Sequence, residues 1–220
     1  PTHAPPPRRH LDMVDQNMQI LSLKDSRLAD TYIYDLRTGA DGLLYGLTEA
    51  GDVFTLEEGE VVSYLSHEIC SISNPGCLLP DPDHPGYLYL EAGISQICHG
   101  KPEDNFKEVD FFDISPLAYV QQMESIGGDL WICTRNGIGV LKEDGFHKLD
   151  GVPMNNSVGH VMTDYEGNLW FTSSRQGVMK IVPNRFLDVF ERCGLEEEVV
   201  NSTCMYGEQL FIATDTGLKV

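Results

Sequence analysis

One motif recurs along this chain and limits its possible folds more than any other feature. The clearest copy, at residues 164–181, reads DYEGNLWFTSSRQGVMKI. An acidic residue and a glycine turn lead into a short apolar run that contains a tryptophan, and a polar loop separates this run from a second one. Such a stretch predicts two β-strands joined by a tight polar turn.

Four further stretches follow the same pattern, at residues 41–56, 86–97, 128–141 and 207–220, of which 86–97 is the weakest. The anchor aromatics of the five copies are spaced by 44, 42, 39 and 41 residues: Tyr45, Tyr89, Trp131, Trp170 and Phe211. A repeat of this length with several short strands is typical of a β-propeller blade. We therefore predict an all-β fold, a β-propeller of four-stranded antiparallel blades, of which about five are present.

An aromatic at one fixed place in each repeat suits the wedge-shaped core between adjacent blades, where a large ring buries much apolar area. The alternative is a β-sandwich whose hairpins match the pattern by chance, and the five copies in register argue against it. Short alternating runs with Gly, Asp and Asn turns exclude a helical solenoid.

The other apolar runs complete the blades. Strands are expected at 30–36, 43–48, 52–56 and 61–65 in the first blade, and at 69–79, 87–91, 95–99 and 107–112 in the second. The third blade is expected at 119–148, the fourth at 158–190 and the fifth from residue 199 onward. Pro80, Pro82 and Pro85 predict a rigid exposed turn, because proline does not fit a central strand. Residues 192–198 indicate a helical turn.

The ends of the chain suggest a piece of a longer protein. Residues 1–10 are rich in proline and arginine and read as a linker or as residues added for expression, so a single propeller domain is expected over 11–220. Runs 11–14 and 19–23 read as outer strands of a blade that begins elsewhere, and the fifth repeat breaks off after its third strand. Run 19–23 could instead close a five-bladed ring; we favour about two further blades outside this sequence.

Composition narrows the classes of partner. Fifteen basic residues against 34 acidic ones give a net charge of −19, which argues against a nucleic-acid groove. Six cysteines show no C-x-x-C pair and no metal-ligand spacing, so neither a metal site nor a cofactor is expected. Cys70 and Cys77 share one loop region, and a disulfide between them remains open. No stretch approaches the length of a membrane span, and no signal peptide opens the chain.

The repeat D-x-x-G-N-L-W-F-T, followed by G-V-x-K-I, closely resembles the two-component regulator propeller repeat. The matching residues are Asp164, Gly167, Asn168, Leu169, Trp170, Thr172 and Gly177, with a second match around Trp131. The resemblance implies a seven-bladed propeller outside the membrane of a bacterial sensor protein. It also implies that a small β-sandwich, a membrane helix and a histidine kinase or diguanylate cyclase output domain follow.

Candidate ligand-binding residues come from the loops that meet at one mouth of a propeller channel, and from one innermost strand. They are Arg135, Asn136, Asn155, Asn156, His160, Arg175 and Asp215. Arginine and asparagine side chains on one concave face suit a carboxylate or the hydroxyls of a sugar. The alternative is that these are ordinary solvated turn residues, and that His160 is a structural histidine.

No catalytic residue is expected. The chain contains no G-x-S-x-G, H-E-x-x-H or phosphate-loop motif, and His84 and His99 have no paired carboxylate at a telling distance in the sequence. Propeller lyases that open streptogramins need a His/Glu set that is missing here, and gluconolactonase-type propellers need channel carboxylates. The expected function is a non-catalytic extracytoplasmic sensing module with a small-molecule or saccharide ligand, in a membrane-anchored protein that could act as a homodimer. An architectural or protein-binding propeller is the alternative.

Overall fold

The computed structural model describes residues 12–14, 20–22, 25–28, 31–73, 75–182 and 189–220. The chain divides into two compact units, Pro1–Ile181 and Val182–Val220, and each is described by itself. Near the start of the first unit, β1 (Asp12–Val14) and β2 (Ile20–Ser22) form a two-stranded antiparallel sheet. This pair agrees with the two strands expected at 11–14 and 19–23.

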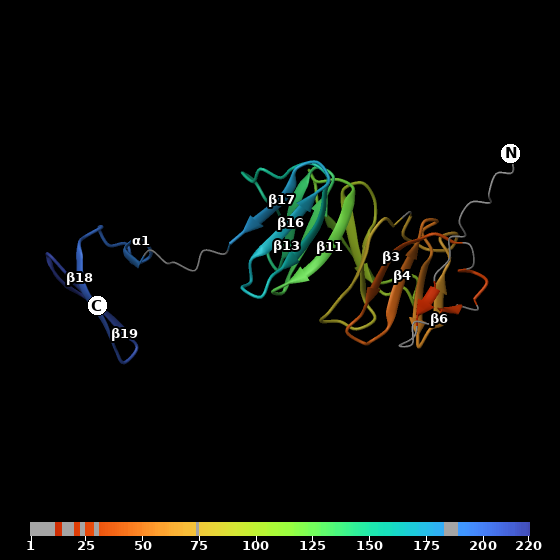
Figure 1. Ribbon diagram of the computed structural model, residues 1–220, viewed down its shortest axis with the longest axis horizontal. Helices are drawn as coiled ribbons and strands as arrows, with labels where there is room; N and C mark the ends of the chain where they lie inside the picture. The colour runs from red at the N-terminus through yellow and green to blue at the C-terminus, as the bar shows by residue number, and fades with distance from the viewer. Residues whose placement is uncertain (1–11, 15–19, 23–24, 29–30, 74, 183–188) are drawn as a thin grey trace. The chain divides into compact units, whose positions relative to one another are not determined.

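Four larger antiparallel sheets follow one another in chain order in the first unit (Figure 1). The first contains β3 (Ile33–Thr38), β4 (Leu44–Thr48), β5 (Val53–Glu57) and β6 (Glu60–Leu65). The second contains β7 (Leu78–Pro80), β8 (Leu88–Glu91), β9 (Gln96–Gly100) and β10 (Val109–Asp113). The third contains β11 (Val120–Ile126), β12 (Asp129–Thr134), β13 (Gly137–Lys142) and β14 (Gly145–Lys148), and the fourth contains β15 (Val158–Thr163), β16 (Leu169–Ser173) and β17 (Gly177–Ile181).

The second unit repeats the same plan on a smaller scale. A short helix, α1 (Val189–Cys193), precedes a three-stranded antiparallel sheet of β18 (Val200–Tyr206), β19 (Gln209–Thr214) and β20 (Gly217–Lys219). Within the described residues, no helix has the length and apolar character needed to cross a membrane.

The five larger sheets are internal repeats. Each anchor aromatic lies on the second strand of its sheet: Tyr45 on β4, Tyr89 on β8, Trp131 on β12, Trp170 on β16 and Phe211 on β19. The first strand carries a register shift at one equivalent place in four of the sheets: Ile33/Asp35, Val120/Gln122, Val158/His160 and Val200/Ser202. The same anchor and the same β-bulge in successive sheets confirm the prediction of propeller blades.

The hydrophobic core lies between neighbouring sheets. Between the first and second sheets, the fully buried residues include Leu47, Leu88 and Leu90. Between the second and third they include Ile97, Met123 and Ile132. Between the third and fourth they include Cys133, Val158 and Phe171. Tyr45, 3% exposed, belongs to the first of these clusters, and Tyr89 and Trp131 pack against the second and third. The expected place of the anchor aromatics is thus confirmed for these three, whereas Trp170 and Phe211, half-buried like Tyr89 and Trp131, belong to none of these clusters.

Polar side chains next to the bulges join neighbouring blades at their innermost strands. The Oδ2 atom of Asp35 on β3 accepts a hydrogen bond from the Leu78 amide at 3.3 Å. Gln122 on β11 repeats this contact, since its Oε1 atom accepts from the Val161 amide at 2.7 Å. The amides of innermost strands, which have no partner strand on one side, are thereby satisfied.

The acidic residue of the motif ties its turn to the anchor aromatic. Asp164 accepts hydrogen bonds from the Asn168 amide at 2.9 Å and from the indole Nε1 of Trp170 at 2.8 Å. These bonds, that of the Trp170 indole first, hold the pKa of the Asp164 carboxyl well below its usual range. Asp41 plays the same part for Tyr45, whose hydroxyl donates to it at 2.6 Å. The motif residues therefore build the fold, as the sequence resemblance implies.

Three expectations about individual elements were wrong or fall outside the described residues. Pro80 ends strand β7 and is buried, rather than lying in an exposed turn; β7 pairs only with β8, so proline's missing N–H costs no ladder bond. Strand β7 covers three residues instead of the expected 69–79. The expected last strand of the fourth blade includes 183–188, outside the described residues, and its end forms α1.

Candidate functional site

Five of the seven predicted binding residues lie in loops that the structure brings together at one end of the third and fourth sheets. Arg135 and Asn136 form the β12–β13 turn, Arg175 lies between β16 and β17, and Asn155 and Asn156 precede β15. We call residues 116–119, 135–136, 155–157 and 174–176 the mouth loops. They are linked directly, since the Ser157 amide donates to the Arg135 carbonyl at 2.8 Å, and the Asn155 and Asn156 amides donate to Gln176 Oε1 at 2.9 and 2.8 Å.

Asn136 uses its side chain to hold the mouth loops rather than to offer it to solvent. Its Oδ1 accepts from the Ala118 amide at 2.7 Å and from the Thr134 hydroxyl at 3.2 Å. Its Nδ2 donates to the Pro116 carbonyl at 2.8 Å. Asn155 is engaged as well, because its Oδ1 accepts from Gln176 at 3.2 Å. An asparagine at position 136 is therefore explained by its structural role in holding the loop, without a bound ligand.

The arginines of the mouth loops keep their charged groups available. Within the part of the chain that the structure describes, the guanidinium groups of Arg135 and Arg175 make no hydrogen bond or ion pair, and both residues are exposed. The Arg135 guanidinium lies 4.9 Å from the centre of the Tyr119 ring, which is 45% exposed. A guanidinium beside an exposed aromatic ring can bind a planar anion and can stack against a sugar.

Tyr119 is held in an unusual backbone conformation. Its φ angle is 59°, in the left-handed region that few non-glycine residues adopt, and its amide donates to the Ile94 carbonyl at 2.8 Å. Ser157, the equivalent residue before β15, has a φ of 48° and the matching bond to Arg135. In both sheets, therefore, a residue with a left-handed backbone precedes the first strand, and its amide is bonded to the preceding blade.

Glu91, a residue that the sequence analysis did not single out, lies at the same end of the second sheet. Its Oε1 accepts a hydrogen bond from the Val120 amide at 3.0 Å. Burial raises the pKa of the Glu91 carboxyl above its usual value, although the Val120 amide and the charge of Arg135 act in the opposite direction. Its position at the end of a second strand, next to the loop at 92–95, is the sequence signal that could have identified it.

The other two predicted residues are placed differently. His160 lies on β15 directly after the bulge and is exposed, at the register position that Asp35 and Gln122 occupy in their sheets. Asp215 lies between β19 and β20 in the second unit, where it accepts a hydrogen bond from Asn201 at 2.9 Å.

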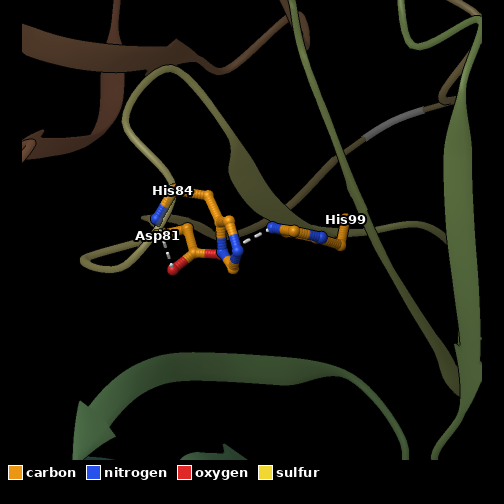
Figure 2. A group of neighbouring side chains, drawn as sticks. All are labelled: Asp81, His84 and His99. Carbon is orange, nitrogen blue, oxygen red and sulfur yellow. Dashed lines mark hydrogen bonds and ion pairs between the residues drawn. The ribbon is translucent and has the colours of Figure 1, made fainter. Parts of the chain in front are cut away.

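A second group of titratable side chains lies at the opposite end of the second sheet. We call Asp81, His84 and His99 the turn cluster. Asp81 and His84 belong to the β7–β8 turn, His99 lies on β9, and the three side chains point toward one another (Figure 2). His84 Nδ1 lies 2.9 Å from Asp81 Oδ2, and His99 Nε2 lies 2.8 Å from the same oxygen. The sequence analysis, which paired neither histidine with a carboxylate, was wrong on this point.

The Asp81 carboxyl of the turn cluster is buried, and its neighbours favour the charged form. Burial by itself would raise the pKa of Asp81, but the Asp83 amide, the His84 ring and the charge of His99 outweigh burial and lower the pKa below its usual value. The His99 ring stacks on Tyr89, with ring centres 4.4 Å apart. Asp81 and His84 are only three positions apart, but His99 joins them through the pairing of β8 with β9, which the sequence motif does not reveal.

Comparison with known proteins supports the fold. No protein-family model matches the chain, and no curated protein matches it significantly. Among solved structures, the extracellular domain of the hybrid two-component system BT3049 from B. thetaiotaomicron is similar, with a TM-score of 0.54 and 20% identity over 84% of this chain and 26% of that chain. The extracellular domain of the hybrid two-component system BT4673 from the same organism is also similar, with a TM-score of 0.62 and 16% identity over 96% of this chain and 30% of that chain.

A WD40 β-propeller domain, that of Doa1, is similar as well, with a TM-score of 0.57 and 12% identity over 74% of this chain and 54% of that chain. The chain spans only about a quarter to a third of the length of the two-component domains. These likenesses and the repeated sheets show the same fold: this chain forms blades of a β-propeller.

Proposed function

We propose that this chain is part of an extracytoplasmic sensor propeller and that its ligand binds at the mouth loops. The observation that carries the proposal is the exposed Arg135 guanidinium beside the Tyr119 ring. The fold, shared with extracellular domains of two-component systems, and the resemblance of the Trp170 motif to the two-component regulator propeller repeat support the setting.

The chemistry of the mouth loops suits a ligand with a carboxylate and ring hydroxyls, such as an acidic saccharide. Arg135 and Arg175 supply two exposed cationic donors whose guanidinium groups make no hydrogen bond or ion pair with the described residues. Tyr119 supplies an exposed aromatic face, on which the apolar side of a sugar ring stacks. Half-buried Glu91 supplies an acceptor behind them, and the overall charge of −19 makes a nucleic acid an unfavourable partner.

Signalling requires that the ligand favours one arrangement of the longer protein over another. The other blades, the downstream domains and a second copy of the protein are the partners through which such a shift would act. Within this scheme the chain itself is non-catalytic, and the mouth loops offer binding groups without a nucleophile paired to a base.

The full chain tests the proposal by thermal-shift screening against acidic and neutral saccharides and small carboxylates. An acidic saccharide should raise the melting temperature of the wild-type chain, and Arg135→Gln should abolish the rise without changing the melting temperature of the free protein. Arg27→Gln, a change at an exposed arginine paired with Asp25, is the matched control and should keep the response. A chain that no solute stabilises but that binds a protein partner would support the architectural alternative instead.

A further inference from the structure

We propose that the turn cluster binds a divalent transition-metal ion of the zinc type, with Asp81 Oδ2, His84 Nδ1 and His99 Nε2 as its three protein ligands. These three atoms all lie within 4.8 Å of one another. They combine two neutral imidazole nitrogens and one carboxylate oxygen, a ligand set that Zn²⁺ and Co²⁺ bind well and that Ca²⁺ and Mg²⁺ do not prefer.

The distances fit a metal ion after a small adjustment. The Asp81 oxygen lies 2.9 Å from His84 Nδ1 and 2.8 Å from His99 Nε2. Around a tetrahedral ion with bonds of about 2.0–2.1 Å, neighbouring ligand atoms are about 3.3 Å apart. The Asp81–His84 and Asp81–His99 pairs must therefore each lengthen by roughly half an ångström, and the two ring nitrogens must come to about the same 3.3 Å separation. The His84 side chain, which is 65% exposed, has the freedom to make that move.

Residues next to the turn cluster, and the backbone of the turn itself, hold the three ligands in the required orientation. Asp81 Oδ1 accepts from the Asp83 amide at 2.9 Å and from the His84 amide at 3.3 Å, which leaves Oδ2 to face the two rings. The His99 ring stacks on Tyr87 and on Tyr89, with ring centres 5.1 and 4.4 Å apart. Such second contacts fix the direction in which carboxylate and imidazole ligands point.

Binding replaces the two N–H···O hydrogen bonds of the turn cluster by three metal–ligand bonds. In the metal-bound state each imidazole is neutral and presents a lone pair where its proton now lies; that proton moves to the other ring nitrogen of a neutral ring, or is released to solvent from a charged one. The ion would then join the β7–β8 turn to strand β9 and stabilise that end of the second sheet. A water molecule would complete the tetrahedral coordination.

The test is a titration of the full chain with Co²⁺, followed by visible absorption, and competition with Zn²⁺. We expect one ion per chain, with the d–d bands of a tetrahedral nitrogen–oxygen site and without a thiolate charge-transfer band. His99→Gln should weaken binding about 100-fold or more. His84→Gln changes an exposed side chain, so it should leave the fold intact and weaken binding at least about tenfold.

His147→Gln is the matched control. His147 Nε2 also lies 2.8 Å from a carboxylate, that of Asp144, but the pair is exposed and has no third ligand among the described residues. This variant should bind Co²⁺ like the wild type, and the same Zn²⁺ concentration should raise the melting temperature of both by more than that of His84→Gln. Equal affinity in the wild type and His84→Gln, a thiolate band, or no binding at all would each overturn the proposal.

Discussion

The mouth loops and the turn cluster lie at opposite ends of the blades and use polar side chains in opposite ways. In the mouth loops, the Asn136 and Gln176 side chains hydrogen-bond to backbone groups, whereas the Arg135 and Arg175 guanidinium groups and the Tyr119 ring are exposed. In the turn cluster, a buried carboxylate and two imidazoles converge within a single sheet. Polar residues in a loop therefore indicate a binding site only where their side chains are not already used in the hydrogen bonds that hold the loop.

The largest expected effect concerns packing between sheets. The mouth loops lie on the third and fourth sheets, which share a core, whereas the turn cluster lies within the second sheet. Phe171 is fully buried between the third and fourth sheets, with its ring centre 5.8 Å from that of Trp131. Phe171→Ala should lower the free energy of unfolding by about 3–5 kcal/mol. Urea denaturation followed by tryptophan fluorescence measures it.

Tyr165→Ala is the control for Phe171→Ala, since that side chain is 97% exposed and its loss should change stability by less than about 0.5 kcal/mol. Binding of Co²⁺ at the turn cluster should survive Phe171→Ala at low denaturant. Equal stability of the two variants would show that the third and fourth sheets do not share a core.

A smaller effect separates structural from binding residues within the mouth loops. Asn136→Ala removes three side-chain hydrogen bonds, two of which hold residues 116–118, and should cost about 1–3 kcal/mol of stability. The same denaturation experiment measures it. If Asn136→Ala abolished saccharide binding at unchanged stability, Asn136 would be a ligand-binding residue, as the sequence analysis predicted.

Glu91, which lies beside the mouth loops, and Asp52, a buried carboxyl of the first sheet, should change stability with pH in opposite directions. The pKa of Glu91 is raised by burial, so its contribution to stability falls as pH rises from 4.5 toward the folded-state pKa. Burial would also raise the pKa of Asp52, but hydrogen bonds from the His67 amide and the Tyr64 hydroxyl lower it overall. Its contribution is therefore present above pH 3.8 and lost as pH falls through the folded-state pKa.

Denaturation curves of Glu91→Gln and Asp52→Asn between pH 3 and 7 measure this difference in sign. Relative to the wild type, Glu91→Gln should gain stability as pH rises, whereas Asp52→Asn should lose stability as pH rises and come nearest to the wild type at low pH. The same slope in both variants would contradict the assignment of opposite pKa shifts.

The sequence could predict the blades because the anchor aromatics and the Asp–Gly turns are local signals repeated at one spacing. It could also predict that Arg135, Asn156 and Arg175 meet, because antiparallel strands bring alternate loops to the same end. It could not show that the side-chain amide of Asn136 is already hydrogen-bonded within the protein, since this depends on the path of residues 116–118. It missed the turn cluster because His99 reaches Asp81 only through the register of β8 with β9.

The smallest expected effect gives the finest test of the comparison. Arg175→Gln removes an exposed guanidinium that no described residue pairs with, so stability should change by less than about 0.5 kcal/mol. If the mouth loops bind an anion, this variant should still weaken binding, because a charge-assisted hydrogen bond contributes about 1.5–3 kcal/mol. Calorimetric titration with the acidic saccharide found by screening, at two salt concentrations, measures both the loss and its dependence on charge. A loss in Arg135→Gln but none in Arg175→Gln would confine the binding site to the third blade and its Tyr119.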